Sequence, residues 1–451
     1  MASQDFNYQL CRKREKEKED AFYFDSAEEK FIEWAKENAI SISSVKPTNE
    51  NLDLEKIAKT IGDAKFVALS EGFHNCKEML SVQLRIIQHL INQCGFNTVL
   101  SETGLPESRL IHDFILGGEM EEGMWEKGLN KMYASWKEGR ELVEYMRDYN
   151  LKNGNALHYY GTDIGGFYQD WKFPLQTILS YLESVDKEYS LELSNELEPF
   201  MVILASTARL NYSEKLSRSQ KDQIADILDR AVENFNQKEE LYKTNGTEKD
   251  FQWARQSMIS MQLAENYYRN FEHRKNVESS KYVGLNGREI AMARNCIWAT
   301  KQRKDAKIIW IDHVIHTKTK SQYQDEVWGF FTPAGQLLRQ HLGCDYFSIG
   351  MIYGDGKFWN KWQRGPGERY IDNIPPWNGK QMSLEKSLSK CGKDMFFLHW
   401  QNALDTSLEC HYWMQYLFSM RENDYFIQVE PREWDACIYL QHVSPATPVA
   451  I

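Results

Sequence analysis

The sequence has no long hydrophobic run and no excess of positive charge, and each absence excludes a class of protein. No window reaches the roughly eighteen apolar residues that a membrane-spanning helix needs. The 451 residues include 54 basic and 65 acidic side chains, which gives a formal net charge of -11. This acidic balance is unfavourable for binding nucleic-acid phosphates or anionic lipid. We therefore expect neither a membrane protein nor a nucleic-acid-binding protein.

Cysteine pairs and a secretory signal are also missing. The eight cysteines are scattered, with no CxxC pair and no compact framework, which favours free thiols in a reducing compartment and argues against a zinc ribbon. The first residues, MASQDFNYQLCRKREKEKEDAF, contain no apolar stretch of the length that a signal peptide needs. We expect a cytoplasmic protein whose residues 1–45 form an N-terminal arm and helix.

Short runs rich in Val, Ile, Tyr and Phe predict buried strands, and amphipathic stretches between them predict helices. The segment CKEMLSVQLRIIQHLINQCG, for example, carries apolar residues at helical spacing and ends at Gly95. This alternation indicates an α/β fold with three layers, α/β/α, around a mainly parallel, mixed sheet. The predicted strands are Lys65–Ser70, Asn97–Glu102, Leu157–Gly161, Lys307–Asp312, Tyr346–Ile352, Met395–His399 and Tyr425–Val429.

The middle of the chain has a different composition. Residues 173–278 contain no convincing strand and show helical spacing in QIADILDRAVENF and QWARQSMISMQLAENYYRNF. We expect a helical insertion that covers a cleft, placed between two halves of the α/β core at 46–172 and 279–451. Residues 354–379 are rich in Gly, Pro and Trp and predict a long irregular connection.

Polar residues follow four of the predicted strands at the point where each strand ends. In open parallel sheets, ligands bind at this carboxyl edge, so the side chains are expected to face one cavity. Taken one at a time, the same residues are equally compatible with helix caps, turns or buried core histidines. They are Glu71 and His74, Glu102, Asp163, and the group Asp312, His313 and His316.

A cluster of this kind suits hydrolysis. Histidine can take a proton from water, a neighbouring carboxylate can orient the ring, and a second histidine or an arginine can stabilise an oxyanion. The sequence has no GxSxG elbow and no cysteine in a nucleophile motif. Water is therefore the expected nucleophile.

The segment SEGFHNCKE resembles the opening motif of the erythromycin esterase family, with Glu71, His74 and Glu78 at the motif positions. Later segments resemble further blocks of that family in the same order: LSETG with Glu102, YYGTD with Asp163, NGREIAMARN with Arg288, Glu289, Met292 and Asn295, and IDHVIH with His313 and His316. GQLLRQHLGCDYFSIGMIYGDG and WDACIYLQHVSPATP are also similar to its later blocks, so the resemblance spans about residues 60 to 448.

The resemblance implies a role for each matching residue. His74 would be the general base on water, Glu71 its orienting partner, Glu102 a water-positioning carboxylate and His313 a further catalytic residue. Substrate contacts would come from Glu78, Arg85, Asp163, Arg288 and His316. No metal or other cofactor is implied. The implied partner is a small ester or lactone, with a macrolide antibiotic as one candidate. Some family members carry a succinoglycan-biosynthesis label.

The chain departs from the family pattern at four positions. Ser70 and Asn75 replace glycines, Gln83 stands where an arginine is expected, with Arg85 as the nearest arginine, and Val314 replaces an asparagine.

Two alternatives therefore accompany the esterase hypothesis. One is a metal-dependent hydrolase, and the other is a binding protein of polysaccharide metabolism with weak catalysis. The metal ligands would come from Glu71, His74, Glu102, Asp163, His313 or His316. The sequence does not predict an oligomeric state.

Overall fold

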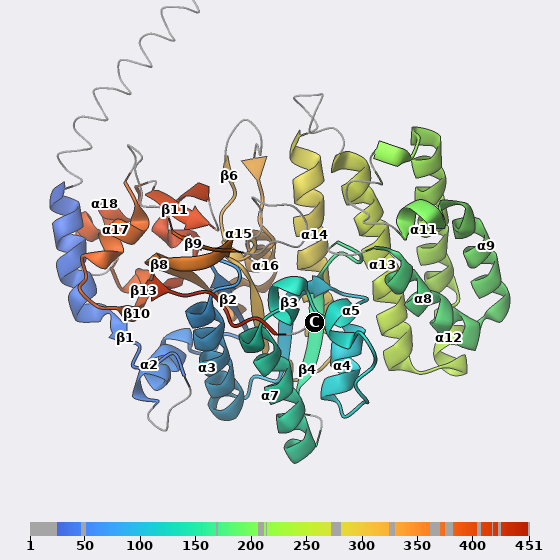
Figure 1. Cartoon of the computed structure of the whole chain (residues 1–451), viewed down its shortest axis with the longest axis horizontal. Helices are drawn as coiled ribbons and strands as arrows, with labels where there is room; N and C mark the ends of the chain where they lie inside the picture. The colour runs from blue at the N-terminus through green and yellow to red at the C-terminus, as the bar shows by residue number, and fades with distance from the viewer. Residues whose placement is uncertain are drawn as a thin grey trace, which may run out of the picture.

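A computed structural model of the chain describes residues 25–46, 51–154, 156–167, 170–205, 212, 214–271, 281–323, 330–360, 370–374, 382–403, 407–416, 418–422 and 425–449. These residues form a central sheet, helices on both of its faces, and a group of helices on one flank (Figure 1). None of the described helices is both long enough and apolar enough to cross a bilayer.

The main sheet of the described residues has nine strands, and most of its pairs are parallel. The exceptions lie at its margins, where β10 and β1 run antiparallel to their neighbours and β9 pairs antiparallel with the far half of β8. The expected mixed, mainly parallel sheet is therefore confirmed. The strand order is β1 (Ile40–Ser41), β10 (Met395–His399), β13 (Ala436–Val443), β8 (Tyr346–Asn360), β2 (Phe66–Glu71), β5 (Ile308–His313), β3 (Thr98–Gly104) and β4 (His158–Asp163), with β9 at Tyr370–Asn373.

Alternating side chains of the central strands pack on opposite faces of the sheet. Val67 and Leu69 of β2 belong to a core shared with α2 (Leu52–Ile61), α3 (Lys77–Cys94) and α7 (Lys137–Asn153). Phe66 and Ala68 belong to a second core on the other face, shared with α14 (Lys281–Thr300) and α16 (Ala334–Leu342). Both faces of the sheet are thus covered, which produces the three layers.

The described part of the predicted insertion is helical throughout and lies to one side of the sheet (Figure 1). Its helices share a core of their own, and α13 packs along α14. The boundaries at 173 and 278 and the covering of a cleft stay predictions. The helices are α8 (Lys172–Val185), α9 (Lys187–Leu204), α11 (Arg218–Gln237), α12 (Glu239–Asn245) and α13 (Glu248–Phe271).

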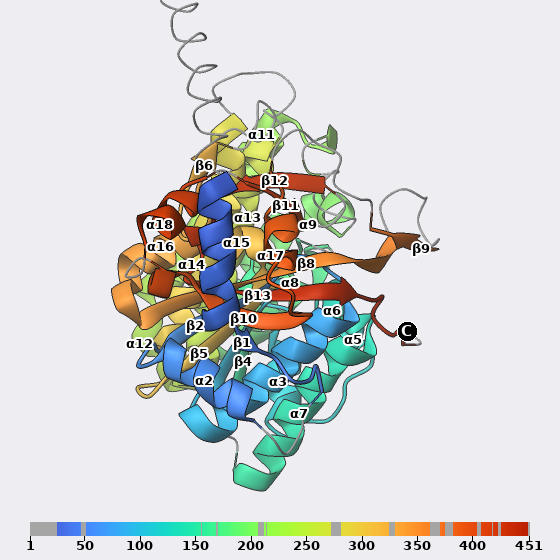
Figure 2. The same cartoon turned by 90° about the vertical axis from the view of Figure 1, so that its left-hand side faces the viewer.

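On the opposite flank, the first described helix packs with segments from the last quarter of the chain. A helix over residues 25–38 packs with Trp400 and Trp413 beside β10 and β13, and Figure 2 shows it in front of that end of the sheet. The other described elements are α4 (Arg109–Ile115), α5 (Met124–Gly128), α6 (Lys131–Ala134), α15 (Val314–Thr317), β6 (Gln322–Tyr323), β7 (Phe330–Phe331), α17 (Leu384–Ser389), α18 (Leu408–Trp413), β11 (Phe418–Glu422), β12 (Tyr425–Val429), and short 3-10 helices at Gly343–Asp345, Trp400–Ala403 and Pro431–Glu433.

One sequence expectation needs correction. Residues 354–360 continue β8, and residues 357–360 pair with β9, so the first part of the expected irregular connection is strand. Residues 361–369 and 375–379 lie outside the described residues. The segment Tyr425–Val429 is a strand, as expected, but it pairs with β11 in a separate hairpin. The strand β13, which lies between β8 and β10, was not among the predicted strands.

Candidate active site

The guanidinium of Arg288, on α14, lies at the centre of the site. Its Nε and Nη2 donate to the two carboxylate oxygens of Asp163 at 2.9 and 2.6 Å, and Nη2 also donates to Oε1 of Glu102 at 2.8 Å. The ring of Phe167 lies 4.1 Å from the guanidinium carbon. Burial raises the pKa of Asp163, and the charge of Arg288 opposes that rise. One cation therefore joins the carboxyl ends of two neighbouring strands, β3 and β4.

The imidazole of His316, on α15, is held in one tautomer. Its Nε2 lies 3.1 Å from Nη1 of Arg288, and its Nδ1 lies 2.7 Å from Oε1 of Glu289. Because a guanidinium only donates hydrogen bonds, Nε2 of His316 must accept one. Nδ1 therefore carries the ring proton and donates a hydrogen bond to the carboxylate of Glu289. The other oxygen of Glu289 accepts from the backbone N–H of Ala334 at 2.9 Å. These contacts fix the orientation of His316 beside Arg288.

Glu71 and His74 form a second group, where β2 ends and the chain turns towards α3. Nδ1 of His74 lies 2.7 Å from Oε1 of Glu71. The carboxylate therefore accepts a hydrogen bond from the Nδ1–H group, and Nε2 carries the lone pair of the ring. Burial raises the pKa of Glu71, and the hydrogen bond from His74 opposes that rise. The side chain of His74 is 13% exposed and that of Glu71 only 1%. His74 is thus the member of the pair that reaches solvent.

Two buried side chains surround this pair. The rings of His74 and His313 lie 4.6 Å apart, and the hydroxyl of Tyr133 donates to Oε1 of Glu71 at 3.4 Å. The imidazole of His313 hydrogen-bonds to the backbone of Gly72. Burial, together with the nearby charge of His74, lowers the pKa of His313 well below its usual value. His313 is therefore neutral at physiological pH.

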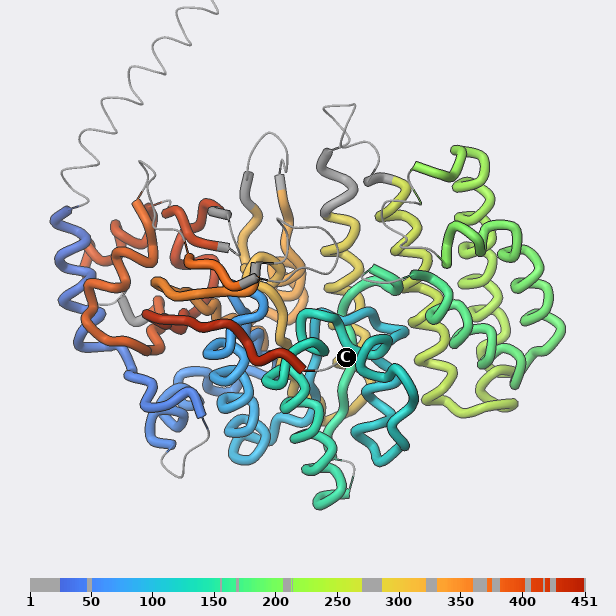
Figure 3. Tube along the Cα trace, in the orientation of Figure 1, coloured from blue at the N-terminus to red at the C-terminus, as the bar shows by residue number. Residues whose placement is uncertain are grey.

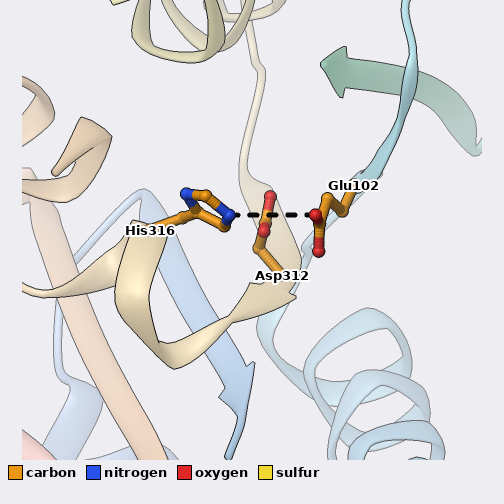
Figure 4. Close-up of side chains that lie close together, drawn as sticks. All are labelled: Glu102, Asp312 and His316. Carbon is orange, nitrogen blue, oxygen red and sulfur yellow. Dashed lines mark ion pairs between the residues drawn. The ribbon is translucent and has the colours of Figure 1, made fainter. Parts of the chain in front are cut away.

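Glu102, Asp312 and His316 come from β3, β5 and α15, and Figure 4 shows how their side chains converge. One possible metal-ligand atom from each lies within 4.8 Å of the others. Burial and the charge of Glu102 raise the pKa of Asp312 well above its usual value.

A carboxylate, a second carboxylate and an imidazole suit zinc, iron or manganese. However, Glu102 Oε1 and His316 Nε2 both accept hydrogen bonds from Arg288. An ion bound through these two atoms would have to displace the guanidinium.

Glu78 and Arg85, both on α3, make other contacts. The two carboxylate oxygens of Glu78 accept from the backbone N–H and the hydroxyl of Ser444, each at 2.6 Å. Arg85 forms a buried ion pair with Asp53, in which Nη1 and Nη2 each donate at 2.8 Å. Their implied roles in substrate binding stay predictions.

Residues 444–449, which we name the C-terminal strap, hold the loop that carries His74. The backbone N–H of Ala446 donates to the carbonyl oxygen of Asn75 at 2.9 Å, beside the contact between Ser444 and Glu78. Farther along the strap, the carboxylate of Glu138 accepts from the backbone and hydroxyl of Thr447 at 2.9 and 2.7 Å. Figure 3 shows the strap passing the first turns of α3 and α7. The strap therefore ties the His74 loop to both helices.

Seven of the nine predicted site residues thus lie in one cluster at the carboxyl edge of the sheet, from Glu71 to His316 along the chain. A sequence model of the erythromycin esterase family matches residues 91–443. The chain belongs to the erythromycin esterase family. The matched range begins after Glu71 and His74, so the placement of these two residues rests on the geometry above.

Similar proteins agree with this assignment. The chain is 24% identical to erythromycin esterase type II of Escherichia coli over 83% of its own length and 89% of that protein. The fold matches a crystal structure named as a succinoglycan biosynthesis protein, with a TM-score of 0.77, 19% identity, and coverage of 94% of this chain and 99% of the other. It also matches a mutant of the erythromycin esterase EreC in its open conformation, with a TM-score of 0.72, 16% identity, and coverage of 91% and 99%. Membership of the erythromycin esterase family supports hydrolase activity.

The structure explains how the chain accommodates its departures from the family motif. Asn75 has a φ of 66°, in the left-handed region that glycine adopts freely and asparagine tolerates better than most residues. Its side-chain oxygen also accepts a hydrogen bond from the indole of Trp136. Gln83 donates to the carbonyl oxygen of Leu69 at 3.0 Å, and Val314 is fully buried in an apolar core. All three residues have well-defined structural contacts.

Three residues near this cluster are not part of the predicted site. The sequence contains a clue to Glu289, because this residue directly follows Arg288 in the motif NGREIAMARN. The sequence contains no such clue to Tyr133, because this residue lies on a short helix and is separated from Glu71 by 62 positions along the chain. Glu107 is fully buried, accepts from the backbone N–H of Gly166 at 2.6 Å, and has its pKa raised to about 8 by burial. Its sequence context, LPESRL, is that of an ordinary turn before a helix.

Proposed function

We propose that this chain hydrolyses an ester or a lactone with a water molecule that His74 activates, without a covalent intermediate. The observation that supports this best is the 2.7 Å contact between Nδ1 of His74 and Oε1 of Glu71. A carboxylate at Nδ1 orients the ring and stabilises the imidazolium that forms when Nε2 takes a proton. The partial exposure of His74 leaves its ring within reach of water.

In this mechanism, Nε2 of His74 removes a proton from water as the water oxygen attacks the carbonyl carbon. The C=O electron pair moves to oxygen, and the guanidinium of Arg288 stabilises the resulting oxyanion. The oxyanion then reforms the carbonyl, the bond from carbon to the leaving oxygen breaks, and the imidazolium of His74 protonates the leaving alkoxide. Water is the only co-reactant, and the products are an acid and an alcohol.

The surroundings of the pair favour a charged His74 in the transition state. His313 is neutral, so it does not repel the imidazolium that forms 4.6 Å away. Arg288 is held by Asp163, Glu102 and His316, so it needs little reorganisation as negative charge develops on the substrate. Because a relative is named for erythromycin hydrolysis, a macrolide lactone is the first substrate class to test.

The test is a panel of macrolides, small lactones and aryl esters, incubated with wild type, His74→Ala and Glu71→Gln. Loss of a general base is expected to lower kcat about 100- to 10,000-fold. His442→Ala is the matched control, because His442 is a 71% exposed histidine on β13 that pairs with Asp355. A substrate that His74→Ala cleaves at the wild-type rate would exclude this mechanism. If wild type cleaved no compound of the panel, the proposed substrate class would be wrong.

A metal-dependent hydrolase is the second candidate, and the convergence of Glu102, Asp312 and His316 is the observation that favours it. Protein purified without chelator would then contain about one equivalent of zinc, iron or manganese by elemental analysis. Its activity would be lost on dialysis against a chelator and restored by that metal. Full activity in metal-free protein would leave the metal-independent mechanism.

A further inference from the structure

A cleft of about 910 Å³ lies away from the catalytic cluster, where the beginning of α13, the end of α14 and the amino end of β4 meet. α13 and α14, which both line the cleft, run side by side in Figure 1. The strand β4 carries His158, in the cleft, at its first position and Asp163, in the cluster, at its last. Five steps along a strand span about 16 Å, so the cleft and the cluster lie at opposite ends of β4.

The cleft is positively charged although the chain as a whole is acidic. Lys249, Arg255, Arg294 and Lys301 line it, and Glu248 is the one carboxylate among its described lining residues, in a chain whose net charge is -11.

Lys249 lies near the carboxylates of Asp113 and Asp250, whereas the other three cations of the cleft have no carboxylate partner among the described residues. Within the described part of the chain, Arg294 and Lys301 form no ion pair, and both are exposed. Arg255 donates from Nε and Nη2 to the uncharged amide oxygen of Asn236, at 2.9 and 2.7 Å. Burial, with Arg303 and Lys249 nearby, lowers the pKa of His158 to about 4. The positive charge of the cleft is thus available to a ligand.

Part of the cleft lining is apolar and aromatic. Ile259 and Ile297 line the cleft together with Trp298, whose ring packs edge-on against Tyr160 at 5.2 Å. The indole Nε1 of Trp298 is buried and has no acceptor among the described residues. A flat or apolar group suits these residues, and phosphate groups suit the lysine and arginine side chains of the same cleft.

We propose that this cleft binds a small molecule that joins two or more phosphate groups to a flat ring, as a nucleoside triphosphate does. Its volume falls in the range of roughly 300–1,000 Å³ that is usual for small-molecule sites, which favours such a ligand over a nucleic acid chain. The proposal does not depend on the esterase mechanism. Its test measures ligand binding and not hydrolysis, so the binding proposal and the esterase mechanism can fail independently of each other.

The test is calorimetric titration of the full chain with ATP, tripolyphosphate and adenosine. We expect ATP to bind more tightly than tripolyphosphate, and adenosine to bind most weakly. The double variant Arg294→Glu and Lys301→Glu is expected to lower the affinity for ATP by about tenfold or more. Both residues are exposed, so the variant is expected to fold, and a thermal melt checks this.

The matched control is the double variant Lys59→Glu and Lys152→Glu, which changes the net charge equally at exposed positions outside the cleft. It is expected to bind ATP within about twofold of wild type. Absence of ATP binding to wild type, or an equal loss in both double variants, would overturn the proposal. So would an oligonucleotide that binds more tightly than ATP and loses that binding in the cleft variant, because the ligand would then be nucleic acid.

Discussion

Arg288 and Asp163 form a buried ion pair with two parallel hydrogen bonds, from Nε to Oδ1 at 2.9 Å and from Nη2 to Oδ2 at 2.6 Å. The pair joins α14 to the end of β4, and Nη2 extends the contact to Glu102 on β3. The same guanidinium therefore holds α14, β3 and β4 together at the carboxyl edge of the sheet.

Arg288→Lys is expected to lower both activity and stability, because an ammonium group cannot form the two parallel bonds. We expect kcat to fall about 100- to 1,000-fold and the free energy of unfolding to fall by about 1 to 3 kcal/mol, because lysine keeps the charge but loses hydrogen bonds. Steady-state kinetics and urea denaturation measure these quantities. In the control Arg230→Lys, which alters an exposed pair with Glu196, the unfolding free energy should change by less than about 1 kcal/mol. Wild-type kcat in Arg288→Lys would remove Arg288 from the mechanism.

Glu107 is expected to make stability depend on pH. Its pKa is raised to about 8 in the folded chain from a usual value of 4.5, so between these values the unfolded chain loses a proton that the folded chain keeps. Stability is therefore lost as pH rises through this window, by up to about 1.4 kcal/mol per pH unit, and is constant above it.

The neutral variant Glu107→Gln removes this dependence. Urea denaturation at pH 5, 6.5 and 8 should show the stability of wild type relative to Glu107→Gln falling at each step. Parallel pH profiles for the two proteins would show that Glu107 is ionised in the folded chain at neutral pH.

Glu78→Gln is expected to slow catalysis through the C-terminal strap. The amide places a donor against one of the two donors of Ser444, so about 1.5 to 3 kcal/mol of unfolding free energy is lost. Because Glu78 and Asn75 are tied to the same strap beside His74, kcat should also fall, by about tenfold or more. Glu138→Gln disrupts the matching contact with Thr447 and should lose similar stability with a smaller change in kcat. Equal kinetic effects in both variants would contradict a local role for Glu78.

Asn75→Gly and Asn75→Val are expected to differ, because φ at this position is 66°. Glycine adopts this conformation without strain, whereas a β-branched side chain costs roughly 1 to 3 kcal/mol there. Thermal unfolding and kcat should both rank wild type near Asn75→Gly and well above Asn75→Val. If the valine variant equalled wild type in both measurements, the left-handed backbone at Asn75 would not constrain the His74 loop.

Much of the cluster could be predicted from the sequence, because local patterns determine it. Each of the strands that lead to Glu71, Glu102, Asp163 and His313 is a short apolar run, and parallel strands present their carboxyl ends at one edge. Arg288 was found through a motif resemblance, since helical spacing alone does not show which strand ends a helix will face.

The strap contacts of Glu78 could not be predicted, because its partner Ser444 lies 366 residues away in the sequence. Residues 354–360 differ from the sequence expectation for another reason. Gly354 and Gly356 read as turn residues, but β8 needs Gly356 because its backbone lies so close to β13 that any Cβ would overlap the carbonyl oxygen of Val443. In this strand, glycine is present because two backbones pack closely. A single sequence does not show whether a glycine serves close packing or a loop.

The contact between Glu78 and Ser444 also has a consequence for the timing of folding. A ribosome adds about 5 to 20 residues per second, so the 366 residues between the two partners take roughly 20 to 70 seconds to synthesise. During that time α3 and the sheet strands before it have emerged, while the His74 loop still lacks its strap. The nascent chain therefore carries β2 and α3 for that time before Ser444 can hold the His74 loop, and any activity that depends on this loop should appear only after Ser444 has left the exit tunnel.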